Sequence, residues 1–178
     1  MKGANIGNSF LELIIGDITK QKTDAVVNAA NKQLAPGGGV AGAIHRAAGK
    51  RLWEECSKLG GCKTGEAKIT KGYNLPAPYI IHTVGPVYSG SSEDPKKLSS
   101  CYKECLKLAN KKNIKSISFP ALSTGYFGYP IKEAARIAIE TTIDELKKTP
   151  KIELVRFVLY DSTALHVHEE LLDLIIKK

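Results

Sequence analysis

Long apolar runs are missing from this chain of 178 residues. No stretch approaches the roughly 18 apolar residues that cross a bilayer, so we predict no transmembrane helix and no membrane partner. The first residues, Met1 to Asn5, carry no apolar stretch ahead of a cleavage site. We therefore see no secretory signal and expect a cytoplasmic protein. Low-complexity tracts and internal repeats are also lacking, which excludes disordered and solenoid classes.

Cysteine is sparse, and its spacing does not fit a zinc site. Five residues separate Cys56 from Cys62, and three separate Cys101 from Cys105. Zinc ribbons use closer pairs, so we predict no metal site, and nothing in the sequence calls for a cofactor. Reduced thiols are the default without a secretory signal. Cys101 and Cys105 lie one helical turn apart, and we expect both to face the core.

Two common nucleotide-binding sites can be excluded. No Gly-x4-Gly-Lys-Ser/Thr stretch occurs, which excludes a P-loop. Gly37-x-Gly39-x-x-Gly42 matches the dinucleotide fingerprint, but about eight residues separate it from the preceding strand, whereas fingerprint glycines follow the strand at once. The chain does carry 26 Lys and Arg against 18 Asp and Glu, a net charge of +8. Such a surface attracts polyanions, although it also serves solubility, and both interpretations stay open.

Strand-like and helix-like segments alternate along the chain. The strand-like ones are 10–15, 24–28, 79–84, 114–119 and 154–160, and the helical ones are 40–53, 98–109, 130–148 and 163–176. This alternation predicts an α/β sandwich with a mostly parallel sheet. No linker interrupts it, so we predict a single domain over residues 1–178.

Two glycine-rich loops follow predicted strands and lead into helices. Residues 37–39 precede the helix near Val40, and residues 123–128 precede Pro130. Glycine lets backbone N–H groups turn toward one point, and a helix N-terminus adds partial positive charge. Ligands of such sheets bind beyond the carboxyl ends of the strands. Two cradles on neighbouring strands therefore predict a diphosphate site, with two simple tight turns as the alternative.

Four polar or aromatic residues flank these loops. Asn28 and Asn31 can each hold a loop or grip a sugar hydroxyl, because an amide both donates and accepts. A buried Asp17 could accept from an exocyclic amine, or it could cap the turn at Thr19. Tyr160 ends the last strand, where its ring could stack on a base or pack ordinarily.

Six stretches in fixed order resemble the macro domain family, in particular its MacroD-like members. They are Gly16–Thr19, Val27–Asn31, Gly37–Gly49, Cys62–Thr70, Tyr79–Pro86 and Phe119–Pro130. The resemblance extends from about Phe10 to Leu172. It implies a three-layer α/β/α sandwich with a mixed, mostly parallel central sheet.

The resemblance also implies an ADP-ribose cleft. Asp17 would hold the adenine amino group with Ile18 beside it, and Tyr160 would stack on adenine. Asn31 and Phe127 would hold the distal ribose. The expected ligand-binding residues are Asp17, Ile18, Asn28, Asn31, Gly37, Gly38, Gly39, Val40, Ser123, Thr124, Gly125, Tyr126, Phe127 and Tyr160, and the expected catalytic ones are Asn31, Gly38 and Gly39.

Many proteins of this family hydrolyse ADP-ribose from acidic side chains or acetate from O-acetyl-ADP-ribose, with water attacking near the distal ribose. MacroD-like hydrolases usually place an Asp after Gly-Gly-Gly-Val to position that water, whereas this chain has Ala41. Other macro domains with Val-Ala-Gly here are hydrolases in which a substrate phosphate and the glycine-loop backbone orient the water. A lost general base costs about 10²–10⁴-fold, so the resemblance implies a weak hydrolase.

Two other functions stay open. The same cleft would serve a non-catalytic reader of ADP-ribose, of ADP-ribosylated proteins or of poly-ADP-ribose. The net charge of +8 together with Tyr160 would also suit a binder of single-stranded nucleic acid.

Overall fold

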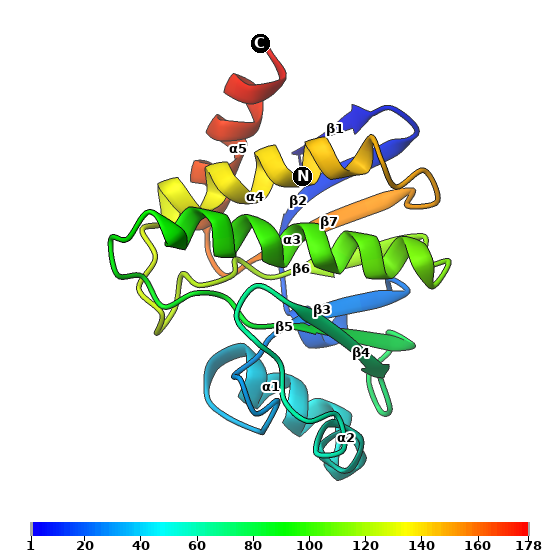
Figure 1. The fold of residues 1–178 in the computed structure, drawn as a ribbon. Coiled ribbons are helices and arrows are strands. Elements are labelled where there is room, and N and C mark those ends of the chain that lie inside the picture. The colour runs from blue at the N-terminus through cyan, green and yellow to red at the C-terminus, as the bar shows by residue number, and fades with distance from the viewer. Residues whose placement is uncertain (1, 178) are drawn as a thin grey trace.

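The computed structural model describes residues 2–177 and places seven strands in one mixed sheet (Figure 1). The order across the sheet is β1-β2-β7-β6-β3-β5-β4. The five inner strands run parallel, and the two edge strands run antiparallel to their neighbours. The strands are β1 (Lys2–Ile6), β2 (Ser9–Ile15), β3 (Ala25–Ala29), β4 (Ala67–Lys71), β5 (Tyr79–Thr83), β6 (Ser116–Phe119) and β7 (Leu154–Leu159).

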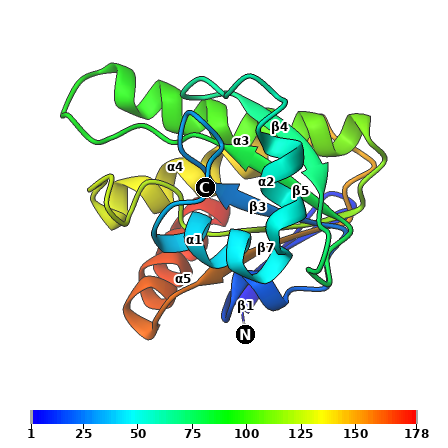
Figure 2. The same ribbon diagram turned by 90° about the horizontal axis from the view of Figure 1, so that it is seen from below.

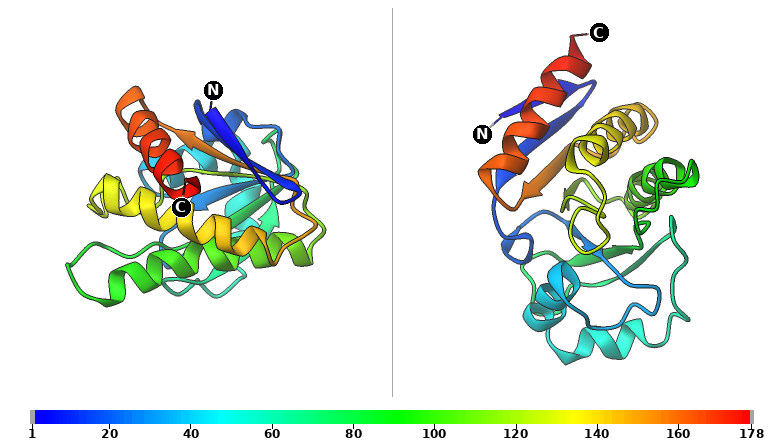
Figure 3. Two further views of the ribbon diagram at one scale, coloured as in Figure 1. Left: turned by 90° about the horizontal axis from the view of Figure 1, so that it is seen from above. Right: turned by 90° about the vertical axis from the view of Figure 1, so that its left-hand side faces the viewer.

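Helices cover both faces of the sheet. One layer holds α3, α4 and α5, and the other holds α1 and α2 together with a short 3-10 turn, η1 (Figures 2 and 3). The helices are α1 (Gly39–Ala48), α2 (Lys50–Cys56), α3 (Glu93–Lys111), α4 (Ile131–Leu146) and α5 (Ser162–Ile176), and η1 spans Ile18–Lys20. The predicted three-layer α/β/α sandwich is confirmed.

Each face of the sheet has its own apolar core, because strand side chains alternate between the faces. On β3, Ala25 and Val27 pack toward α3, α4 and α5, whereas Val26 points toward α1 and α2. Within the larger core, the rings of Tyr102, Phe119 and Phe157 lie in mutual contact, with centroids 5.1–6.0 Å apart. Tilted and offset pairs of this kind add about 0.5–1.5 kcal/mol each beyond their buried area.

Sequence patterns missed both edge strands. β1 is short and contains Gly3, whose missing β-carbon makes room for the ring of Phe10. β4 alternates apolar and polar residues, with Ala67 and Ile69 against the larger core, so its period of two was a usable signal. Antiparallel edges of this type close a parallel sheet without a further crossover helix.

Two helix boundaries also differ from prediction. The segment predicted as one helix over 40–53 is divided at Gly49, which has φ +90° and closes α1 by donating to the carbonyl of His45. The helix α3 begins at Glu93, ahead of the predicted helical segment 98–109. Asp94 explains this start, because its carboxylate accepts bonds from the amides of Ser89 and Gly90. None of the helices in residues 2–177 is both long enough and apolar enough to span a membrane.

The join between β6 and β3 is the weakest in the sheet. Only two residue pairs connect these strands, Ala25 with Ile117 and Val26 with Ser118, whereas the other neighbours share four to six pairs. The chain leaves β3 toward α1 on one face and leaves β6 toward α4 on the other. This is a topological switch point, where open α/β sheets form their ligand crevices.

Candidate functional site

The predicted ligand-binding segments lie along one edge of the sheet. Asp17 follows β2, Tyr160 follows β7, the loop 120–129 follows β6, and the loop 30–38 follows β3. These four strands are consecutive neighbours in the sheet and run parallel, so their carboxyl ends meet at the same edge. The segments therefore form a row in that order.

The two glycine-rich loops approach each other across the seam between β3 and β6. A β-carbon placed on Gly38 would lie 4.0 Å from Cε2 of Tyr126, which is its nearest neighbour. Tyr126 itself is 96% exposed. The prediction that the two glycine-rich loops follow neighbouring strands is confirmed.

Both loops present backbone N–H groups that the protein does not use. Within residues 2–177, no acceptor receives a hydrogen bond from the amides of residues 37–41 or 124–127. The first run opens α1, whose N-cap Gly38 supplies no side-chain cap. Unpaired amides at a helix N-terminus carry partial positive charge and bind anions. Two such runs on loops that approach each other can neutralise a diphosphate placed between them without any charged side chain.

The loop after β3 is held in shape by Asn31. Its Oδ1 accepts from the amide of Ala35 at 2.9 Å, and its Nδ2 donates to the Ala35 carbonyl at 2.8 Å. Leu34, fully buried, has φ +58°, a strained backbone for a branched side chain. The Nδ2 atom also lies 3.3 Å from where a β-carbon of Gly37 would sit. One N–H and one lone pair of Asn31 therefore stay free beside the glycine run.

The loop after β6 is tied to two other segments and is closed by one bond within itself. Its residue Leu122 donates to the Tyr102 hydroxyl of α3 at 3.3 Å, and the Phe127 carbonyl accepts from the amide of Tyr88 at 2.8 Å. The amide of Tyr129 donates to the carbonyl of Ser123, which has φ +67°. These bonds fix the backbone, so the amides of residues 124–127 keep their direction.

A contact between Gly85 and Ser123 sets how closely the segment after β5 approaches this loop. A β-carbon on Gly85 would come within 2.2 Å of Ser123 Oγ, which is buried and has no partner within residues 2–177. We expect Gly85→Ala to lower the free energy of unfolding by about 1–3 kcal/mol through overpacking. Adding Ser123→Gly should restore most of that loss in urea denaturation, since it removes the clash and suits φ +67°. If the effects of the two substitutions on the free energy of unfolding simply add in the double variant, the predicted contact between residues 85 and 123 is wrong.

Asp17 is exposed, which corrects the expectation of a buried carboxylate. Its Oδ1 caps η1, accepting from the Thr19 amide at 2.9 Å and the Thr19 hydroxyl at 2.7 Å. These two bonds to the charged form lower the pKa of the Asp17 carboxyl. Within residues 2–177, the second oxygen of Asp17 accepts no hydrogen bond, and the amide of Ile18 donates none. Capping therefore leaves one oxygen of Asp17 for a ligand.

Tyr160 stands beside Asp17 at this end of the row, since the amide of Gly16 donates to the carbonyl of Leu159. Its ring is 93% exposed, so it is not packed into the end of the sheet. The same edge therefore offers a carboxylate oxygen and an unpacked aromatic face. These groups suit a base, whereas the glycine loops suit phosphates.

Asn28 does not reach the crevice, and its predicted ligand contact is wrong. Its side chain is 0% exposed, and Nδ2 lies 3.0 Å from Nδ1 of His82 on the adjacent strand β5. His82 Nε2 lies 2.9 Å from the Thr70 hydroxyl, which donates to the carbonyl of Lys71. The bonds are consistent with one arrangement: Asn28 donates to Nδ1, and Nε2–H donates to Thr70. Sequence reasoning missed this network, which joins β3, β5 and β4.

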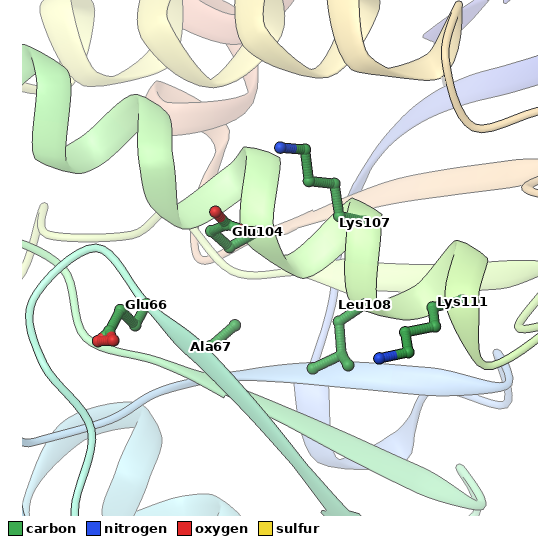
Figure 4. Close-up of a pocket in the computed structure, with 6 residues that line it drawn as sticks. All are labelled: Glu66, Ala67, Glu104, Lys107, Leu108 and Lys111. Atoms are coloured by element: carbon green, nitrogen blue, oxygen red, sulfur yellow. The ribbon is translucent and has the colours of Figure 1, made fainter.

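Ala41 lies in the first turn of α1 and is 5% exposed. It leaves the glycine run without a carboxylate of its own, as the sequence indicated. The part of the chain that the structure describes brings no three His, Cys, Asp or Glu side chains together as a metal site. A shallow pocket between β4 and α3, lined among others by Glu66, Lys107 and Leu108, lies outside the row of ligand-binding segments (Figure 4).

Comparison with known proteins is consistent with this geometry. The model of the Macro domain family matches residues 27–138. The chain belongs to the macro domain family. Among solved structures, the Oceanobacillus iheyensis macrodomain with ADP superimposes with a TM-score of 0.96 at 42% identity, covering 99% of this chain and 96% of that one. The Trypanosoma brucei macrodomain in complex with ADP-ribose gives 0.87 at 42% identity, covering 91% and 68%.

Two curated relatives are similar in sequence over most of this macro domain. A macro domain-containing protein of Chlorobaculum tepidum is 51% identical over 166 residues, which are 93% of this chain and 96% of that protein. The ADP-ribose glycohydrolase MACROD2 of Xenopus laevis is 49% identical over 161 residues, which are 87% of this chain. The macro domain spans only 38% of that longer protein.

Proposed function

We propose that this macro domain binds ADP-ribose along the row of loops and hydrolyses ADP-ribosyl esters of acidic side chains. The observation that carries the proposal is the pair of unpaired amide runs, residues 37–41 and 124–127, on two loops that approach each other at Gly38 and Tyr126. A diphosphate placed between them receives bonds from both loops and the partial charge of α1. The relatives named for ADP-ribose, and those solved with it, support the same ligand.

The order of the loops gives the ligand its direction. Asp17 and Tyr160 stand at the β2 and β7 end, where the adenine would accept stacking and donate its amino group. The diphosphate follows at the β6 and β3 seam. The distal ribose then lies toward Asn31 and Phe127, the latter half-buried in the loop after β6.

Hydrolysis would occur at the distal ribose. One water is consumed, and one of two C–O bonds of the ester breaks, either between the ribose carbon and the ester oxygen or between that oxygen and the acyl carbon. The products are ADP-ribose and a free carboxylic acid that ionises at neutral pH. The same balance releases acetate from O-acetyl-ADP-ribose. With Ala41 in the first turn of α1, the water would be oriented by a substrate phosphate and by the amides of Gly38 and Gly39.

A reader without turnover is the second candidate, and Ala41 favours it. No carboxylate lies in the glycine run to take a proton from water, and loss of a general base costs about 10²–10⁴-fold in rate. Binding depends on the backbone amides and would be unaffected by this residue.

A release assay separates the two candidates. We expect micromolar protein to release free ADP-ribose from a glutamate-linked ADP-ribosylated substrate slowly, and Asn31→Ala to slow it further because the loop loses its two bonds to Ala35. Ala41→Asp should raise the rate, since a carboxylate would then stand at the amino end of α1. Tight calorimetric binding of ADP-ribose without release above buffer would select the reader.

A further inference from the structure

A basic site adjoins the loop after β3 and takes no part in the proposed binding of ADP-ribose. A surface hollow is formed by residues 60–64 together with Lys32 and Lys97. Three lysines line it, Lys32, Lys63 and Lys97, and no carboxylate does. None of the three forms an ion pair with any side chain of residues 2–177. Their charges are therefore available to a partner.

The hollow is built from three separate segments that are bonded together. The carbonyl of Lys32 accepts from the amide of Cys62 at 2.8 Å, which joins the loop after β3 to the segment before β4. Ser100 on α3 donates to the carbonyl of Gly65 at 2.7 Å, and the stem of Lys97 lies 3.4 Å from where a β-carbon of Gly65 would sit. The lysines thus project from a fixed backbone.

Its position relates the hollow to the distal ribose. Lys32 follows Asn31 directly, and Asn31 in turn lies against Gly37. A protein bearing ADP-ribose must leave the crevice at the distal ribose, because that sugar carries the linkage. The chain flanking the modified side chain then passes beside Lys32.

We propose that this lysine hollow binds an acidic polypeptide segment flanking the ADP-ribosylated residue, an inference that rests on the proposed function. Three unpaired cations with no carboxylate are complementary to clustered Asp and Glu. A nucleic acid is less well matched, because no aromatic ring lines the hollow, and bases bound by such proteins stack on aromatic rings.

Calorimetry with defined peptides tests the assignment. Two peptides carry the same non-hydrolysable ADP-ribosyl linkage, one flanked by Asp and Glu and the other by Ser and Gln. We expect the wild type to bind the acidic peptide about tenfold more tightly, as three exposed ion pairs of modest strength allow. The preference should invert in K32E/K63E/K97E, because the introduced carboxylates repel the acidic peptide, and the preference of the wild type should weaken as salt is raised.

Matched variants separate a local effect from net charge. K112E/K147E/K148E removes the same charge at the far ends of α3 and α4, from exposed positions, and should keep the preference. K32Q/K63Q/K97Q removes the three charges without adding any, so its preference should fall to about onefold, and it remains informative if the glutamate variant does not fold. Binding of free ADP-ribose should be equal in all variants.

Three results would overturn the assignment. If the wild type binds free ADP-ribose but binds both peptides equally, the peptide-binding role of the hollow is rejected and the proposed function is not. Displacement of the acidic peptide by single-stranded RNA but not by an unmodified acidic peptide also rejects that role. Failure of the wild type to bind free ADP-ribose rejects the proposed function itself, and the inference falls with it.

Discussion

Gly125→Asp should weaken ADP-ribose binding at least about 100-fold while leaving the fold intact. Gly125 lies within the amide run 124–127, its φ is outside the left-handed region, and nothing lies within 4 Å of a β-carbon built there. The backbone therefore tolerates a side chain. A carboxylate would accept bonds from the same amides and would repel the diphosphate. Two like charges about 4 Å apart interact by about 4 kcal/mol at an effective dielectric constant of 20, and about 3 kcal/mol corresponds to 100-fold.

Gly125→Asn is the matched control, because it has the same shape without the charge. We expect it to weaken binding less than about tenfold in calorimetry, with both variants showing the thermal midpoint of the wild type. Equal losses for Asp and Asn would mean that the loop excludes bulk rather than charge. Wild-type affinity in the Asp variant would mean that the diphosphate does not lie at residues 124–127.

Acid should destabilise this protein through His82. Burial, with a smaller contribution from the nearby His45, lowers the pKa of His82 to about 3 from an ordinary 6.5. Between these values the unfolded chain binds a proton that the folded chain excludes. The stabilisation from neutral His82 is thus complete above pH 6.5 and is lost as the pH falls toward 3. We expect about 1.4 kcal/mol of unfolding free energy to be lost per pH unit through the middle of this range.

Urea denaturation at a series of pH values measures the effect, and two variants isolate it. His82→Gln removes the titrating ring and should flatten the curve by that slope, whatever its stability at pH 7. Thr70→Val removes the hydroxyl partner of Nε2 and leaves the ring buried, so it should lower stability at every pH and keep the slope. Burial also lowers the pKa of His45 and His168, so a shallower acid slope should remain in His82→Gln. An unchanged slope in His82→Gln would contradict the buried neutral histidine.

Local patterns predicted the layers of this fold because the inner strands and their helices carry strong apolar periodicity. Cys101 and Cys105 on α3, for example, are fully buried as expected. The edge strands have weaker signals. β1 has half-exposed residues and a glycine, so its stability comes from pairing with β2 rather than from its own side chains. The residues of a five-residue segment do not reveal which strand it pairs with.

The candidate site was predictable in position and less so in detail. Glycine-rich loops after strands indicate an anion site through backbone geometry alone, and runs of glycine can be read directly from a sequence. The roles of the two asparagines depend on contacts across the fold: Asn28 meets His82, 54 residues away, and only Asn31 borders the crevice. Asp17 and its cap at Thr19 are local, so both of its predicted roles were visible, but its exposure was not.

The seam between β6 and β3 has a mechanical consequence. The sheet consists of two halves, β1-β2-β7-β6 and β3-β5-β4, that share only two residue pairs. Each glycine loop is attached to a different half. A ligand bound by both loops would therefore link the two halves and resist their separation. Because this division arises from chain connectivity, substitutions in the loops can change which ligand is bound without disturbing the strand pairing within either half.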